Sequence, residues 1–185
     1  MKNQIKLLLS AVALVGFQAQ AQVVNGGFET GNFAGWTQFG NEGATGVVGN
    51  FDGVNPIDGN YQGAFGSVGS TGGIEQSVAG VTAGNTYELS FWLADLSTGP
   101  SYFDVTFGGQ DLLTMVNPEP FGYTHYTFAV PVTSDLLAFT FQQNPSYFLI
   151  DDITVNAGVP DSGSTMAMMS LGLVGLGGAA RRFRR

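Results

Sequence analysis

Short runs of alternating apolar and polar residues recur through the middle of this chain. In residues 85–95, Tyr87, Leu89, Phe91 and Leu93 share one face of such a run. Similar runs cover 102–107, 122–130, 136–142 and 147–155, and weaker ones cover 22–24, 36–39, 45–48, 63–65 and 74–78. A period of two is that of a half-buried β-strand, and no part of 22–158 keeps a helical period beyond about two turns. The pattern therefore restricts this part of the chain to β-structure.

Turn residues separate these runs. Short groups of Asn, Asp, Gly or Pro stand between them, at 25–27, 58–60, 83–85, 108–109 and 144–146. The chain also has 15 Phe, 6 Tyr and 2 Trp, enough apolar rings to anchor even its Gly-rich stretch 26–73. Roughly nine or ten short strands with polar turns predict an all-β fold, a two-sheet jelly-roll sandwich with long connections in its first half.

The charged residues are sharply divided along the chain. All six Lys and Arg lie at the two ends, at positions 2 and 6 and within 181–185. Residues 22–158 contain no Lys or Arg but thirteen of the fourteen acids. Such a body has no cationic surface for phosphate groups and is repelled by anionic lipid headgroups. Nucleic-acid binding and phosphoryl transfer are therefore excluded, and the absence of Cys excludes disulfides and zinc fingers.

The first 21 residues have the three parts of a secretory signal peptide. Lys2 and Lys6 form a basic start, an apolar run covers 7–17, and Ala19 and Ala21 supply the small residues of an A-x-A cleavage site. The alternatives are a membrane anchor or a buried core helix. The eleven apolar residues make only about 17 Å of helix, however, against a membrane core of about 30 Å. We predict that signal peptidase cleaves after Ala21 and that the remaining chain is exported.

The C-terminal end has the layout of a short membrane-spanning segment. Residues 166–180 are apolar apart from Ser170, and four Arg follow within 181–185. Fifteen residues give about 22 Å of helix, which snorkelling Arg side chains extend. A buried Gly-rich helix is the alternative, and the Arg cluster argues against it. After the signal peptide at 1–21 we predict a sandwich domain at 22–156, a linker at 157–165, a transmembrane helix at 166–180 and a cytoplasmic basic tail at 181–185.

A short motif precedes the apolar segment: Val159, Pro160, Asp161, Ser162 and Gly163. Followed by the apolar helix and the Arg cluster, this motif resembles the VPDSG variant of the PEP-CTERM sorting signal. The resemblance implies recognition and removal of the tail by an exosortase, a multipass membrane peptidase. It also implies delivery to the cell surface or to an exopolysaccharide matrix. Pro and Gly keep such a motif extended or turned, so that a protease reaches it outside the membrane.

Three segments of the body resemble a second family. The stretch 24–36, which begins Val-Asn-Gly-Gly-Phe-Glu, is similar to the first strand and loop of galactose-binding-like jelly rolls, the fold of many carbohydrate-binding modules. Residues 87–94 resemble a central strand of that fold, and residues 148–155 resemble its last strand. The resemblance implies that the first and last strands lie side by side in a sandwich of the kind that binds sugars.

In that fold a carboxylate from each of these two strands, together with loop carbonyls, commonly holds a structural Ca²⁺. Glu29 and either Asp151 or Asp152 occupy the matching positions. Asp151 shares strand parity with Leu149 and Ile153 and is therefore expected to point inward, where a carboxylate needs a cation that no Lys or Arg of the body supplies. A solvated position at the rim of the sheet is the alternative for Asp151.

Catalytic chemistry has little support in the sequence. His125 is the only His, lies within a predicted strand and is expected to face solvent, so a Ser–His–Asp triad is not favoured. The thirteen acids of the body single out no pair typical of a glycosidase. We therefore predict that the chain is not an enzyme.

Sugar binding is the activity that the sequence favours. Aromatic rings stack on sugar faces, while acids and amides bind hydroxyl groups. The rings that lie off the predicted core faces are Trp92, Tyr102, Tyr123 and Tyr147, and packing is the alternative role for each. We predict an exported surface or matrix protein whose sandwich binds exopolysaccharide. The alternatives are a structural matrix or adhesin subunit that binds no glycan, and a small secreted hydrolase.

Overall fold

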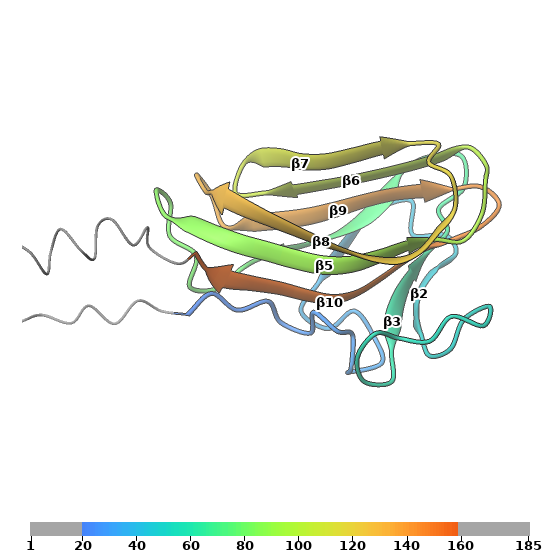
Figure 1. Cartoon of the computed structure of the whole chain (residues 1–185), viewed down its shortest axis with the longest axis horizontal. Coiled ribbons are helices and arrows are strands. Elements are labelled where there is room, and N and C mark those ends of the chain that lie inside the picture. Colours follow the sequence, from blue (N-terminus) through green and yellow to red (C-terminus); the bar gives the residue numbers. More distant parts are fainter. Residues whose placement is uncertain (1–19, 159–185) are drawn as a thin grey trace, which may run out of the picture.

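The computed structural model of this protein describes residues 20–158. Within them the chain forms ten β-strands and no helix, arranged in two antiparallel five-stranded sheets that pack face to face (Figure 1). The prediction of an all-β, two-sheet jelly-roll sandwich is therefore confirmed.

Each sheet mixes strands from both halves of the chain. The β9 sheet, named here for its central strand, has the order β1 (Thr37–Gly40), β4 (Gly72–Ser77), β9 (Leu136–Gln143), β6 (Ser101–Phe107), β7 (Gln110–Val116). The β10 sheet has the order β2 (Thr45–Val48), β3 (Gln62–Phe65), β10 (Phe148–Ala157), β5 (Thr86–Asp95), β8 (Phe121–Pro131). The last strand of the chain thus lies at the centre of its sheet.

The core between the sheets is built largely from Phe. The rings of Phe65 and Phe141 stack with centroids 4.0 Å apart, and Phe91 meets Phe139 edge to face at 5.2 Å. Each such side chain contributes about 1.5–3 kcal/mol when it is fully buried. Both sheets and all of the core cluster except Ala21 lie within residues 22–158, so this segment is a folding unit that can be produced alone.

Two details of the strand prediction are wrong. Residues 22–24 form only an isolated bridge, in which the Gln22 N–H donates to the Ala79 carbonyl at 2.9 Å. β7 is absent from the predicted runs because Leu112 and Leu113 are adjacent in it, where the pairing with β6 shifts register. A β-bulge breaks the alternation on which the prediction depends.

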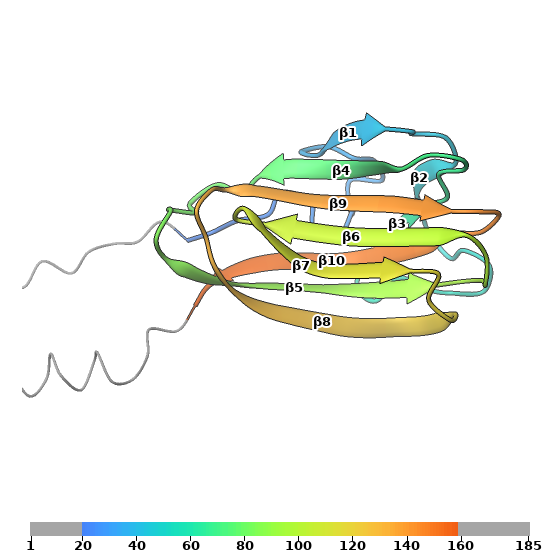
Figure 2. The ribbon, with the colours of Figure 1, turned by 90° about the horizontal axis from the view of Figure 1, so that it is seen from above.

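The chain enters and leaves the sandwich at the same end (Figure 1). Gly158 is held there by a hydrogen bond from its N–H to the Thr86 carbonyl at 2.9 Å. The connections from β5 to β6, β7 to β8 and β9 to β10 close the opposite end (Figure 2). Residues 20–158 contain no helix able to cross a bilayer. Residues 1–19 and 159–185 lie outside the described part, so the signal peptide and the transmembrane helix stay predictions, as do the domain limits.

Candidate functional site

Three side chains with polar or aromatic groups form a row across the outer face of the β10 sheet. The strand register places Asp151 of β10 opposite Trp92 of β5, and Trp92 opposite His125 of β8. Trp92 faces outward because its neighbours Phe91 and Leu93 are the ones that enter the core. Residues far apart in the sequence thus meet on one surface of three adjacent strands.

Trp92 and His125 form a stacked pair on this face. Their ring centroids lie 4.7 Å apart with an interplanar angle of 26°. Trp92 is half-buried and His125 is exposed. The outward position of His125 agrees with the sequence prediction. We call these two residues the stacked pair.

Hydroxyl groups continue the face beside the stacked pair. The next row of the register aligns Thr154, Ser90 and Thr127, and the Ser90 and Thr154 hydroxyls are hydrogen-bonded at 2.9 Å. One further row along, Glu88 and Asn156 are opposite one another, and both are exposed. An aromatic platform with hydroxyl, amide and carboxylate groups beside it offers the partners that a sugar needs.

Tyr123 borders the stacked pair on the same face but is tied into the fold. Its hydroxyl donates to the Gln62 side-chain carbonyl of β3, and the Gln62 amide donates in turn to the carbonyls of Gly49 at 2.7 Å and Val54 at 3.0 Å. Gln62 is fully buried. Burial, and to a lesser degree the nearby Asp151 carboxylate, raises the pKa of Tyr123, so its hydroxyl stays protonated and remains a donor.

Asp151 is fully buried beneath the loop that leads into β3. Its Oδ2 accepts from the backbone N–H groups of Ile57 at 2.7 Å and Asp58 at 3.3 Å, and its Oδ1 accepts from the Asp152 N–H at 2.7 Å. Burial raises the pKa of Asp151 to about 6, although these three hydrogen bonds lower it. The carboxylate therefore holds the loop against β10.

The reason given from sequence for the burial of Asp151 is wrong. Asp152 has a positive φ of 51°, and the pairing of β10 with β5 shifts register between Asp151 and Thr154. This bulge reverses the parity, so Ile153 packs in the core between the sheets while Asp151 lies on the outer face with Leu149. Asp151 is buried by the loop over it and not by the core.

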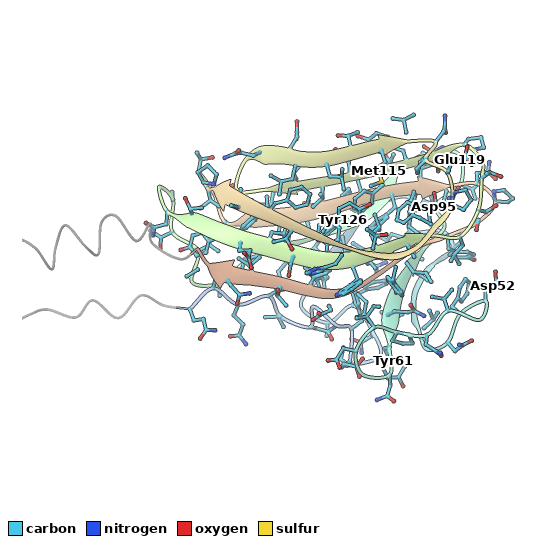
Figure 3. All side chains as sticks on the ribbon, viewed as in Figure 1. Asp52, Tyr61, Asp95, Met115, Glu119 and Tyr126 are labelled. Carbon is cyan, nitrogen blue, oxygen red and sulfur yellow. The ribbon has the colours of Figure 1, made fainter. Side chains whose placement is uncertain are left out.

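Glu29 fastens the same loop at a second point. Its carboxylate accepts hydrogen bonds from the backbone N–H groups of Asn60 and Tyr61, both at 2.9 Å. Glu29 itself is exposed. Figure 3 shows Tyr61 on the segment beyond β3 and β10, away from the β9 sheet. The chain beside Gly26 runs along β10, because the Ile153 N–H donates to the Gly26 carbonyl at 3.0 Å, as the family resemblance implies.

The predicted calcium ligands do not form a cation cage in this arrangement. The oxygens of Glu29 and Asp151 accept from backbone N–H groups, where a Ca²⁺ ion needs six to eight oxygen ligands. Asp152 is half-buried, and within residues 20–158 no three acids or His converge as metal ligands do. In this arrangement the carboxylates of Glu29 and Asp151 accept hydrogen bonds from backbone N–H groups and are not positioned as ligands of one cation.

The remaining predicted rings have different surroundings. Tyr147 lies at one end of the same outer face, where it packs edge to face on Phe51 with centroids 4.7 Å apart. Tyr102 lies on the outer face of the other sheet, and burial together with Asp104 and Asp111 raises its pKa. The structure thus gathers Trp92, Tyr123 and Tyr147 on one face and leaves Tyr102 apart.

A family described as "Carbohydrate binding domain" matches residues 20–146. That match covers well over half of the chain and includes every strand except the last. The chain belongs to this family of carbohydrate-binding domains. A second family, the VPDSG-CTERM motif, matches residues 158–183 and confirms the sorting signal recognised in the sequence. No curated protein sequence matches the chain.

Solved structures support the fold of this carbohydrate-binding domain. TmCBM61, solved in complex with β-1,4-galactotriose, is 19% identical with a TM-score of 0.58, and the match covers 76% of this chain and 100% of that one. The K1 cleaved adhesin domain of Lys-gingipain from Porphyromonas gingivalis W83 is 17% identical with a TM-score of 0.54, over 72% and 96%. The Clostridium thermocellum xylanase 10B, solved as CBM22-1 and GH10 modules with xylohexaose, is 18% identical with a TM-score of 0.52, over 76% and 29%. The chain thus spans less than a third of that xylanase structure.

Proposed function

We propose that this domain binds a glycan on the outer face of the β10 sheet, with the stacked pair as the platform. The observation that carries the proposal is the stacking of Trp92 on exposed His125, on a face that also carries hydroxyl, amide and carboxylate groups. A stacked ring pair covers the apolar face of a sugar, while Ser90, Thr154 and Asn156 bind its hydroxyl groups. The domain has a binding role and no catalysis of its own.

The charge of the body points to the class of glycan. Residues 22–158 contain no Lys or Arg, and acids lie near the platform at Glu88 and Asp152. Uronate or sulfate groups would meet these acids and no Lys or Arg, which costs binding energy and slows association. We therefore propose a ligand without anionic groups.

The VPDSG-CTERM motif supports a proposal for delivery. An exosortase-type peptidase would remove the tail within the motif at 159–163 after export, and the domain would then reside at the cell surface or in the surrounding exopolysaccharide. An exopolysaccharide of the producing cell is then the glycan that the domain meets first. The sequence of events is export, tail removal and retention by the bound polymer.

A glycan array tests the binding proposal with residues 22–158. The unmodified domain is expected to bind at least one uncharged glycan, and Trp92→Ala is expected to weaken that binding by about tenfold or more, as loss of a central aromatic anchor does. Tyr102→Ala is the matched control, because Tyr102 lies on the other sheet. Equal loss in both variants would contradict the proposed site. Absence of binding to any glycan, including the polymer of the producing cell, would favour a structural matrix subunit.

Calcium at Glu29 and Asp151 is a separate proposal. Its support is a fully buried carboxylate in a segment without Lys or Arg, and it requires the carboxylates to turn from the loop amides toward the ion. A chelator is expected to lower the melting temperature of residues 22–158 if the ion is bound. An unchanged melting curve of verified metal-free protein would remove calcium and leave the hydrogen-bonded loop as the whole account.

A further inference from the structure

β8 is the longest strand at an edge of either sheet. It has 11 residues and pairs on one side with β5, from Thr86 opposite Pro131 to Asp95 opposite Phe121. No described strand pairs with its other side, and Figure 2 shows β8 at the border of the molecule. About half of its backbone N–H and C=O groups therefore point away from the sheet.

The other edges of the two sheets are short or protected. β1 and β2 have 4 residues each. β7 has 7 residues and contains Asp111. Proteins commonly guard sheet edges with short strands, charges and Pro. β8 has no Asp, Glu, Lys or Arg, and Pro stands only at its two ends, at Pro120 just before it and at Pro131, so residues 121–130 form a long edge without acids, Lys, Arg or Pro.

We propose that β8 pairs antiparallel with β8 of a second copy of this chain, about a two-fold axis. Such a contact is self-complementary, because the same strand supplies both rows of hydrogen-bonding groups. The proposal concerns self-association and does not rest on glycan binding.

The distribution of charge supports a second copy as the partner. Two bodies that carry thirteen acids each and no Lys or Arg repel one another over most of their surfaces. β8 is a strip without ionised carboxylates, so two copies meet there without placing acid against acid. A basic partner would instead be drawn to the acids elsewhere on the body.

Two aromatic side chains of β8 add to the contact. Tyr126 and Phe128 stack on Phe91 with centroids 5.5 Å and 6.2 Å away, yet both remain half-buried although they contact the core cluster. A second β8 beside them would cover part of what remains exposed. Burial of apolar surface is the favourable term that accompanies the new backbone hydrogen bonds.

The paired strands would join two candidate binding faces. A two-fold axis perpendicular to the sheet keeps both outer faces on the same side, so the His125 rings of the two copies lie on adjacent strands. With strands about 4.8 Å apart, the two Trp92 rings are separated by roughly three strand spacings, about 14 Å. If the face binds glycan as proposed, one polymer chain could contact both copies, and the gain would come from avidity.

Sedimentation of residues 22–158 over a concentration series tests the pairing. The unmodified domain is expected to form dimers, and added salt is expected to favour them because it screens the repulsion between acidic bodies. Thr127→Glu places a negative charge on exposed β8 surface and is expected to weaken the dimer by at least about tenfold. Thr37→Glu is the matched control, since Thr37 is an exposed Thr on the β1 edge and is expected to leave the dimer intact.

Amide hydrogen exchange locates the contact in the same samples. The dimer is expected to protect amides of β8 that exchange freely in Thr127→Glu, while the core strands exchange equally in both, which shows that the variant is folded. A domain that stays monomeric at every soluble concentration overturns the proposal. So does a dimer that Thr37→Glu dissociates and Thr127→Glu does not, or one whose protection lies on another strand.

Discussion

Asp95 is buried at the end of the sandwich where the β5–β6 connection lies (Figure 3), and Ser101, the first residue of β6, is buried too. The Asp95 Oδ1 accepts from the Gln143 side-chain amide and from the Ser97 N–H at 3.3 Å. Its Oδ2 and the Ser101 hydroxyl have no hydrogen-bond partner among the described residues. A buried carboxylate with one free oxygen is costly, and no Lys or Arg of the body compensates for it.

This residue makes the stability of the domain depend on pH. Burial raises the pKa of Asp95 above its ordinary value of 3.8. The folded state therefore holds the proton more tightly than the unfolded state does. The stabilising contribution is fully present below 3.8 and is lost as the pH rises through the raised value. We expect the free energy of unfolding to fall as the pH rises above about 4, which denaturant titration at several pH values measures.

Asp95→Asn should flatten that profile. Asn keeps the Oδ1 acceptor and removes the buried charge. At pH 7 the variant is expected to be more stable by about 1 kcal/mol. In this variant the free energy of unfolding still decreases with rising pH, but less steeply, because the raised pKa of Asp151 also contributes to the decrease. The control is Asp135→Asn at an exposed position, and profiles that run parallel in all three proteins would contradict the assignment.

For single residues, the sequence predicts which side chains face away from the core better than it predicts which side chains they contact. Alternation with Phe91 and Leu93 predicted that Trp92 faces away from the core, and the structure places it there. Its stacking on His125 depends on the register between β5 and β8, for which the chain carries no local signal. Gln62 was missed for the same reason: its role comes from meeting Tyr123 across the sheet.

The loop between β2 and β3 is the element that most depends on side chains from elsewhere. Asp151 holds its middle, at Ile57 and Asp58, and Glu29 holds its end, at Asn60 and Tyr61. The carboxylates of Asp151 and Glu29, which lie outside the loop, therefore hold this loop in place, because the loop itself forms few strand hydrogen bonds. Such a segment opens locally when its acceptors are removed.

Replacing Glu29 tests how the loop is fastened. Glu29→Ala removes the acceptor for the Asn60 and Tyr61 N–H groups, so these two amides are expected to exchange hydrogen about tenfold faster. Glu29→Gln is the matched control, because its side-chain carbonyl can still accept, and its effect should be smaller. Unchanged exchange at both amides in Glu29→Ala would show that the loop is held by other contacts.

At the scale of elements, strands with strict alternation could be predicted and irregular ones could not. Regular runs located β5, β6, β8, β9 and β10 to within one or two residues. The bulges in β7 and β10 defeated the same reasoning, because an extra residue reverses which side chains face the core. Because of the bulge in β7, this strand was not predicted. Because of the bulge in β10, Asp151 was correctly predicted to be buried but was assigned to the wrong face of the sheet.

The whole molecule combines a complete sandwich with a sorting motif that follows it directly. The chain enters and leaves at one end of the sandwich, so both outer faces and the far end are clear of the point where the tail departs (Figure 1). The family match and the motif match account for almost the whole of residues 20–183. Both could be recognised from sequence, the sorting signal from its motif, apolar segment and Arg cluster and the binding domain from the segments 24–36, 87–94 and 148–155.

Removal of the tail should change where the protein goes but not whether it folds. A chain that ends at Thr165 keeps every described strand, so its domain is expected to melt as residues 22–158 do. In the producing cell it should appear in the medium or the periplasm and not at the surface, which fractionation and immunodetection measure. Unchanged surface delivery of this shortened chain would contradict the sorting role of the tail.

The indole N–H signals of ¹⁵N-labelled residues 22–158 test the proposed binding face most directly, because the chain has only two Trp. Trp36 is buried and donates to the Asn25 carbonyl at 3.2 Å, whereas Trp92 lies half-exposed in the stacked pair. During titration with a glycan that the domain binds, the Trp92 signal is expected to shift while the Trp36 signal stays in place. Binding that leaves the Trp92 signal unmoved, with shifts confined to Tyr102 and its neighbours, would contradict the account.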